Sequence, residues 1–277
     1  MIRSARASDD ELRQIAAEIR QRVVRMSHVA GTPHLASALS CVDILVAAYW
    51  HALTIDPARP DDPLRDRLIL SKGHAATALY AVLARRGFFD PQLLDSYATE
   101  GSVLVEHPSP HAVPGIEAAT GSLGHGLPLG VGMALAGRIQ SRRYRVCVVM
   151  SDGECNEGSV WEAAMLAAAQ RLEQLVVVVD YNKWQATGRS NEVLALAPLR
   201  EKWAAFGFRA REIDGHDLAA LCEALDEPQE GRGQPLALIA HTVKGRGVSF
   251  MEDDNNWHYR VPNEDELRRA LEELSRS

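Results

Sequence analysis

Residues 150–161 read "MSDGECNEGSVW" and gather three carboxylates where an apolar run ends and an alanine-rich stretch begins. The run before them does not alternate polar and apolar residues, which is typical of a strand buried on both faces. Three such runs occur along the chain: "RVCVVM" (145–150), "LVVVVDYN" (175–182) and "PLALIAHTV" (235–243). Helical patterns between them supply crossovers, so the sequence predicts a doubly wound, mostly parallel α/β sheet with helices on both faces.

Further patterns extend this prediction along the chain. We expect additional strands in "DRLILSKGH" (66–74) and "FRAREID" (208–214), and helices over 9–27, 36–50, 73–87, 122–140, 158–171, 217–226 and about 263–275. Residues 88–120 lack periodicity, and irregular segments of that length usually carry function. No repeat or linker interrupts the pattern, so we expect one domain over 1–277.

Composition excludes several classes of protein. The net charge of −7 argues against a nucleic-acid surface built on positive charge. The 4 cysteines form no CxxC pair, which favours a reducing compartment over a disulfide framework. No apolar run reaches the ~18 residues of a membrane helix. We therefore expect a cytoplasmic protein that binds neither nucleic acid nor membrane.

The acidic cluster after residue 150 stands where parallel sheets bind ligands, beyond the carboxyl ends of the strands. Buried carboxylates are costly unless a cation neutralises them, and Mg²⁺ takes a few oxygen ligands. A calcium loop starting at Asp152 is excluded, because its glycine comes one place late and Ala163 stands where a glutamate belongs. A solvated turn with helix-capping acids is the plain alternative.

A second polar position weakens that alternative. Asn182 lies about thirty residues after Asp152, past one helix and the next strand, so adjacent strands offer a carboxylate and an amide to one ion. Gly153 and Gly158 let backbone approach an anion, and the start of the helix at 158 adds partial positive charge. The pattern predicts a site for a metal and a diphosphate together.

"SDGECNEG", the interval of about thirty residues and "DYNKW" resemble the thiamine-diphosphate motif, which is written GDG, about thirty residues, then N. The resemblance implies that Asp152, Asn182 and the carbonyl of Trp184 bind Mg²⁺, for which Ca²⁺ or Mn²⁺ can substitute. Ser151 replaces the first glycine of the motif.

Other stretches narrow the family. "LSKGHAATALYAVLA" (70–84), "PGIEAATGSLGHGLPLGVGMALA" (114–136), "IDGHD" (213–217) and "GRGVSFMEDDNNWH" (245–258) resemble the transketolase family, in its order. The length matches the N-terminal, diphosphate-binding domain of that family. The resemblance implies that the cofactor is bound by His74, Gly121, Ser122, Leu123, Gly153, Glu154, Asn182 and His258.

Four histidines match family positions around the diphosphate and the reacting carbons of the sugar: His34, His74, His107 and His258. With a pKa near 6.5, histidine can donate or accept a proton at neutral pH. His111 lies close to His107, and the spacing to "PGIE" allows either to be aligned.

The resemblance also implies partners. Glu157 and Glu162 match glutamates at the family's subunit interface. The glutamate that contacts the cofactor's pyrimidine ring belongs to a further domain that this chain lacks. We therefore expect the N-terminal subunit of a split transketolase, active only with a C-terminal, pyrimidine-binding subunit, in a heterotetramer. It would transfer a two-carbon ketol unit from a ketose, such as a sugar phosphate, to an aldose.

Alternatives remain open at this level. The chain could belong to another split thiamine enzyme, such as a deoxyxylulose-phosphate-synthase-like protein or a 2-oxo-acid dehydrogenase α subunit. It could also be a non-catalytic partner subunit. A nicotinamide-binding oxidoreductase is disfavoured, because Gly121, Gly124 and Gly126 do not form GxGxxG directly after a strand.

Overall fold

The computed structural model describes residues 7–110, 112–227 and 229–276. Its centre is a five-stranded sheet in the order β1-β2-β3-β5-β4, with every neighbouring pair parallel. The strands are β1 (Arg67–Leu70), β2 (Val146–Ser151), β3 (Leu175–Tyr181), β4 (Arg209–Asp214) and β5 (Leu236–His241). The predicted parallel α/β sheet is confirmed.

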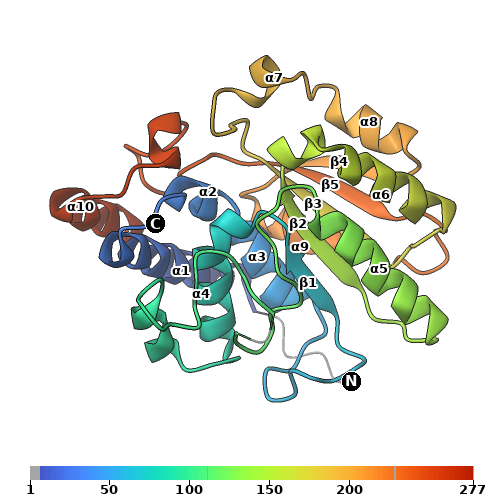
Figure 1. The fold of residues 1–277 in the computed structure, drawn as a ribbon, viewed down its shortest axis with the longest axis horizontal. Helices are drawn as coiled ribbons and strands as arrows, with labels where there is room; N and C mark the ends of the chain where they lie inside the picture. The colour runs from blue at the N-terminus through green and yellow to red at the C-terminus, as the bar shows by residue number, and fades with distance from the viewer. Residues whose placement is uncertain (1–6, 111, 228, 277) are drawn as a thin grey trace.

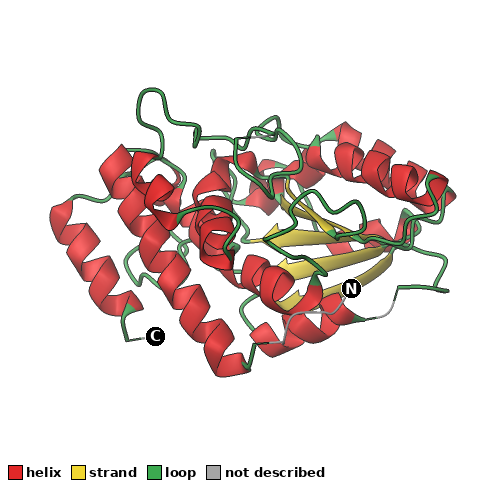
Figure 2. Cartoon of the chain, turned by 90° about the horizontal axis from the view of Figure 1, so that it is seen from below, coloured by secondary structure: helices red, strands yellow, loops and turns green. Residues whose placement is uncertain are grey.

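Helices cover both faces of this sheet (Figures 1 and 2). The α-helices are α1 (Asp9–Ala30), α2 (Leu35–Ser40), α3 (Val42–Ala47), α4 (Ala76–Arg86), α5 (Gly126–Ile139), α6 (Gly158–Ala169), α7 (Ser190–Val193), α8 (Leu199–Ala205), α9 (Leu218–Asp226) and α10 (Glu264–Leu274). One core joins α1 to α4 and α9 to strand residues such as Leu68 and Val149. The other joins α5, α6 and α8 to their sequence neighbours, such as Ile69 and Val148. This alternation is how a strand buries both of its faces.

The strands differ in burial according to their place in the sheet. β2 and β3 are buried at every residue, as their apolar sequences predict, and β5 at all but its last. β4 lies at one edge, and Arg211, Glu212 and Asp214 on it are exposed. β1 lies at the other edge and is 4 residues long.

Capping side chains explain the ends of the long helices. Ser8 accepts a hydrogen bond from the backbone N–H of Glu11, and the Glu11 carboxylate accepts from the Ser8 backbone in return. Gly31 ends α1 in the left-handed conformation. Asn263 and Glu266 form the same reciprocal cap at the start of α10.

Two predicted helices differ in the structure. The stretch predicted as one helix over 36–50 is broken at Cys41 between α2 and α3, and continues as a π-helix over Ala48–Ala52. The break occurs where the Ser37 carbonyl accepts from Lys72 Nζ at 2.8 Å. The helix predicted from 122 begins only at Gly126, because Gly121 and Gly124 have positive φ values that a right-handed helix excludes.

Two further points concern the described residues. None of the helices within them is both long and apolar enough to cross a bilayer. All four cysteines are buried and unpaired, as expected for a chain without a disulfide framework: Cys41, Cys147, Cys155 and Cys222.

Candidate active site

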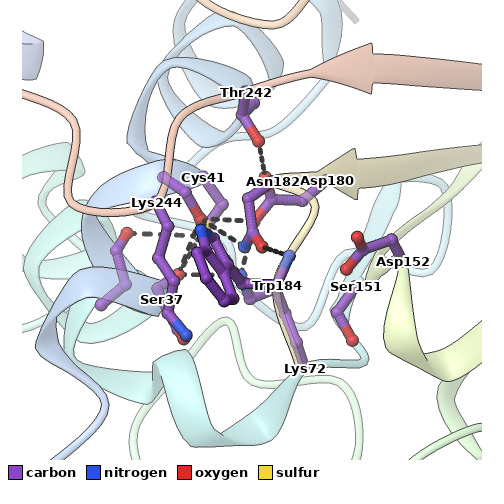
Figure 3. A network of polar contacts seen from close by, with 12 residues as sticks. Ser37, Cys41, Lys72, Ser151, Asp152, Asp180, Asn182, Trp184, Thr242 and Lys244 are labelled. Carbon is purple, nitrogen blue, oxygen red and sulfur yellow. Dashed lines mark hydrogen bonds and ion pairs between the residues drawn. The ribbon is translucent and has the colours of Figure 1, made fainter. Parts of the chain in front are cut away.

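The polar residues that follow the strands meet at one edge of the sheet. Lys72 follows β1, Asp152 follows β2, Asn182 follows β3, and Thr242 and Lys244 follow β5. Figure 3 shows these side chains together, on loops beyond the tips of the strands. This is the edge at which open parallel sheets bind ligands.

Asp152 carries a buried carboxylate without an opposite charge. It is 0% exposed, and its Oδ1 accepts from the Gly153 N–H at 2.9 Å. Its Oδ2 accepts from the Lys183 N–H at 3.0 Å and from the Ser190 hydroxyl at 2.8 Å. No basic side chain in the described ranges forms an ion pair with it, and burial raises its pKa to about 7. A cation bound here would remove the cost of burying this charge.

Two further oxygens lie beside Asp152. Asn182 Oδ1 accepts from the backbone N–H of Trp184 at 3.1 Å, which holds the amide next to the Trp184 backbone. Asn182 Nδ2 donates to the Ser40 hydroxyl at 3.3 Å, so the oxygen rather than the nitrogen faces away from Ser40. Within the described chain, no hydrogen bond to the Trp184 carbonyl is found. One carboxylate, one amide oxygen and one carbonyl form the hard-oxygen set that Mg²⁺ prefers.

The loop that carries Trp184 is fastened from outside. The Trp184 indole donates to Asp253 Oδ1 at 2.8 Å, and the Arg189 guanidinium lies 3.8 Å from the centre of the indole ring. Arg189 also donates to both Asp253 oxygens, at 2.6 and 2.7 Å. Asp253 therefore positions the segment that presents the Trp184 carbonyl.

Ser151 stands where the motif has its first glycine, and the backbone accepts it. It is the last residue of β2 and does not have a positive φ, so no glycine is required. Its N–H and hydroxyl donate to Glu154 Oε2 at 2.8 and 3.2 Å. Glu154 also accepts from the Ser71 hydroxyl and from the Gly124 N–H. The Glu154 carboxylate is thus fully engaged inside the protein, which leaves its backbone to meet a cofactor.

Two buried donors near the site lack partners. Gln185 Nε2 and Thr120 Oγ1 are buried without a hydrogen bond to any described residue. A Cβ on Gly153 would lie 3.2 Å from Gln185 Cγ, so this side chain lies directly over Gly153. Unsatisfied buried donors are costly, and an oxygen-rich anion such as a diphosphate would satisfy them.

A buried ion pair forms the floor of the site. Lys72 Nζ contacts Asp180 Oδ2, and both side chains are 0% exposed. The Ser40 hydroxyl donates to the same carboxylate at 2.6 Å, and the Thr242 hydroxyl donates to its other oxygen. Burial opposes the ammonium charge, but Asp180 holds the pKa of Lys72 above its usual value. Sequence reasoning assigned no role to these residues, although their position after the strands was a signal.

Three of the four predicted histidines pack together. The ring centroids of His34 and His74 lie 5.3 Å apart, those of His34 and His258 5.1 Å, and those of His74 and His258 6.2 Å. The backbone N–H of His34 donates to the His258 carbonyl at 2.9 Å. Residues from three distant segments thus converge on one point.

These rings are uncharged near neutral pH. Burial lowers the pKa of His34 to about 4 and that of His258 to about 3, and nearby cations add to both shifts. Burial also lowers the pKa of His74 well below its usual value. A neutral imidazole offers one donor and one acceptor, which suits binding and orienting hydroxyl and phosphate oxygens.

His107 lies beside this group, in an exposed position. Its ring packs on Gly121, where an added Cβ would lie 2.5 Å from His107 Cδ2 and where φ is +138°. His107 is also one of the groups that lower the pKa of His34. Its alternative, His111, lies outside the described residues. Ser122 and Leu123, next to Gly121, are exposed.

Glu157 and Glu162 point away from the site. Both are exposed, on the face of the molecule formed by α5 and α6. Large apolar side chains are exposed on the same two helices: Leu129, Ile139, Met165 and Leu166. Apolar residues exposed together often mark a surface that another chain covers.

Comparison with known proteins identifies the family. The profile described as "Transketolase, thiamine diphosphate binding domain" matches residues 12–275. One of the named subunits of the apulose-4-phosphate transketolase of Actinobacillus succinogenes is 41% identical, over 96% of this chain and 97% of its own. 6-Deoxy-6-sulfo-D-fructose transketolase subunit SqwG of Clostridium sp. is 38% identical, over 96% of this chain and 97% of its own.

Solved structures agree with this assignment. Transketolase from Campylobacter jejuni superposes with a TM-score of 0.91 at 26% identity. The match covers 97% of this chain and 43% of that one, so the chain spans less than half of the solved enzyme. Transketolase from Leishmania mexicana gives a TM-score of 0.89 at 25% identity, over 98% of this chain and 42% of that one. The chain therefore belongs to the transketolase family and corresponds to its thiamine-diphosphate-binding domain.

Proposed function

We propose that this chain is the N-terminal subunit of a two-chain transketolase, a transferase that moves a two-carbon ketol unit from a ketose to an aldose. One observation carries the proposal: His34, His74 and His258 pack together at the edge of the sheet where the oxygens of Asp152, Asn182 and Trp184 meet. A metal–diphosphate site and a cluster of neutral hydrogen-bonding rings are what such a reaction requires. Residues 1–277 form one domain in this proposal.

The metal is Mg²⁺, with Ca²⁺ or Mn²⁺ able to replace it. Asp152, Asn182 and the Trp184 carbonyl would hold it, and the unpaired buried charge of Asp152 supports this assignment. The three ligands share two strand ends and are already aligned by the hydrogen bond from Trp184 to Asn182. Phosphate oxygens and water would complete the coordination.

Thiamine diphosphate supplies the carbanion chemistry when it is bound, and the protein binds, orients and protonates. Gly121, Ser122, Leu123, Gly153, the backbone of Glu154, Asn182, His74 and His258 would line its site. The unsatisfied donor of Gln185 above Gly153 supports an anion at this place. His34 and His107 would donate to substrate hydroxyl oxygens, together with His74 and His258.

The second chain is a C-terminal, pyrimidine-binding subunit. The Actinobacillus relative is named as one of the subunits of its transketolase, which supports a two-chain enzyme, and that relative has nearly the length of this chain. The exposed apolar residues of α5 and α6 support a second copy of this chain on that face, with Glu157 and Glu162 at the contact. Together these contacts would build a heterotetramer.

Calorimetry with two chains tests this proposal. Thiamine diphosphate with Mg²⁺ is titrated into this chain alone, and then into its mixture with a candidate C-terminal subunit. We expect tight binding that needs the metal and is strongest in the mixture, followed by ketol transfer with a sugar phosphate or a sulfo-sugar as donor. The relatives named above make apulose 4-phosphate and 6-deoxy-6-sulfofructose the first donors to assay.

A matched pair of variants makes the test specific. Asp152→Asn should abolish metal-dependent binding, whereas Asp214→Asn, at the exposed end of the edge strand β4, should leave it unchanged. Equal binding by both variants would contradict the metal assignment. Tight binding without ketol transfer in the mixture would instead favour another split thiamine enzyme or a non-catalytic subunit.

A further inference from the structure

Lys244 holds a buried ammonium without an anionic partner. The residue is 0% exposed, and its Nζ lies 2.8 Å from Asn255 Oδ1 and 2.8 Å from His258 Nδ1. Among the described residues, no carboxylate lies within ion-pair distance of it. Its two hydrogen bonds therefore go to neutral groups, an unusual arrangement for a charge that is removed from water.

This contact fixes the direction of one hydrogen bond. An ammonium has three donors and no acceptor, so the nitrogen of His258 that faces it must accept. A neutral imidazole carries one proton, and with Nδ1 as acceptor that proton is on Nε2. Burial and the charge of Lys244 both keep the ring neutral, because both lower the pKa of His258.

The surroundings hold the pair in this arrangement. Asn255 accepts from Lys244 and donates through Nδ2 to the Ala186 carbonyl at 3.1 Å, which ties it to the loop that follows Trp184. The His258 carbonyl accepts from the backbone of His34. The ring thus has little freedom to turn over and exchange its two nitrogens.

We propose that Lys244 is a positioning residue that locks His258 as the Nε2–H tautomer, so that His258 acts in the site as a hydrogen-bond donor and not as a base. The donor is strengthened, because the ammonium behind the ring polarises its N–H bond. Such a group suits an anionic oxygen, and the identification of that oxygen as a diphosphate oxygen rests on the proposed function. The proposal gives His258 a different task from a proton acceptor.

Nitrogen-15 NMR of the full chain labelled at histidine reads the tautomer directly, without cofactor. A protonated and an unprotonated ring nitrogen differ widely in chemical shift, and the His258 signals are assigned by their loss in His258→Gln. We expect unprotonated Nδ1 and protonated Nε2 in the wild type and in Lys244→Arg, which keeps the donor. Lys244→Met should give a mixture of tautomers, whereas Lys202→Met, at a lysine that donates to the Ala195 carbonyl, should change nothing.

A protonated Nδ1 in the wild type overturns the proposal, and so does an unchanged tautomer in folded Lys244→Met. If Lys244→Met does not fold, the wild-type spectrum and Lys244→Arg still decide. Calorimetry adds a second measurement: Lys244→Met should weaken binding of thiamine diphosphate with Mg²⁺ by at least about tenfold, since hydrogen bonds to charged groups are the stronger class. Failure of the wild type to bind the cofactor would contradict the proposed function and leave the tautomer result standing.

Discussion

Replacing Lys72 with methionine should cost the chain about 3 kcal/mol of unfolding free energy. Lys72 and Asp180 are both 0% exposed, so water cannot solvate the carboxylate once the ammonium is gone. Removing one partner of a buried pair typically costs about 3–5 kcal/mol. Ser40 and Thr242 would still donate to Asp180, which places the expected loss at the lower end of that range.

A double-mutant cycle separates the lost charge from lost packing. Replacing both members of a buried pair by neutral side chains is often close to neutral, so Lys72→Met with Asp180→Asn should be more stable than Lys72→Met alone. Urea unfolding at pH 7, followed by tryptophan fluorescence, measures all four proteins. The chelator EDTA is present throughout, so that bound metal does not contribute.

An exposed ion pair serves as the control. Arg143 and Glu230 have side chains that are 79% and 65% exposed, and Arg143→Met should cost less than about 1 kcal/mol. If Lys72→Met costs no more than this control, the buried pair does not stabilise the floor of the site and the reasoning is refuted.

Three further predictions concern other parts of the molecule. Burial opposes the charge of Asp43, but Arg20 and His216 hold its pKa below the usual value, so its contribution to stability is present above about pH 4 and is lost as the pH falls below that. The stability difference between the wild type and Asp43→Asn should therefore shrink from pH 6 to pH 3 in urea titrations, and a difference that grows in acid would contradict the assignment. Gly121→Ala should destabilise the chain by at least about 1 kcal/mol, because φ is +138° and its Cβ would overlap His107, whereas Gly188→Ala, with 3.5 Å to Val193, should be neutral by thermal unfolding. Asp253→Ala should change the unfolding free energy by less than about 1 kcal/mol yet weaken Mg²⁺-dependent cofactor binding about tenfold, since Asp253 positions Trp184; equal effects on both measurements would argue against that role.

The sequence predicted the sheet because its signal is local. Val146–Ser151 and Leu175–Tyr181 are apolar at nearly every position, and this pattern alone separates a strand buried on both faces from one exposed on one side. The strand ends then placed Asp152 and Asn182 together without knowledge of any tertiary contact. The same reasoning put three histidines at one site only through a family resemblance, since residues 34, 74 and 258 share no local pattern.

Interactions between distant residues were beyond the sequence. The break at Cys41 depends on Lys72, 35 residues from Ser37 along the chain, whose ammonium takes the Ser37 carbonyl. Lys244 as the neighbour of His258, and Asp253 as the anchor of Trp184, likewise depend on how two loops meet. Propensity describes each segment separately, so it cannot supply a hydrogen bond that a second segment provides.

The two edges of the sheet restrict how these subunits can assemble. An unprotected edge strand invites a strand of another chain to join it, and proteins prevent this with short strands and with charged side chains. β1 has 4 residues, and β4 exposes Arg211, Glu212 and Asp214, so each edge carries one of these safeguards. Growth of the sheet from one copy to the next is thereby disfavoured. Association is directed to helical surfaces, where contacts are made by side chains and a finite complex rather than a fibre is the outcome.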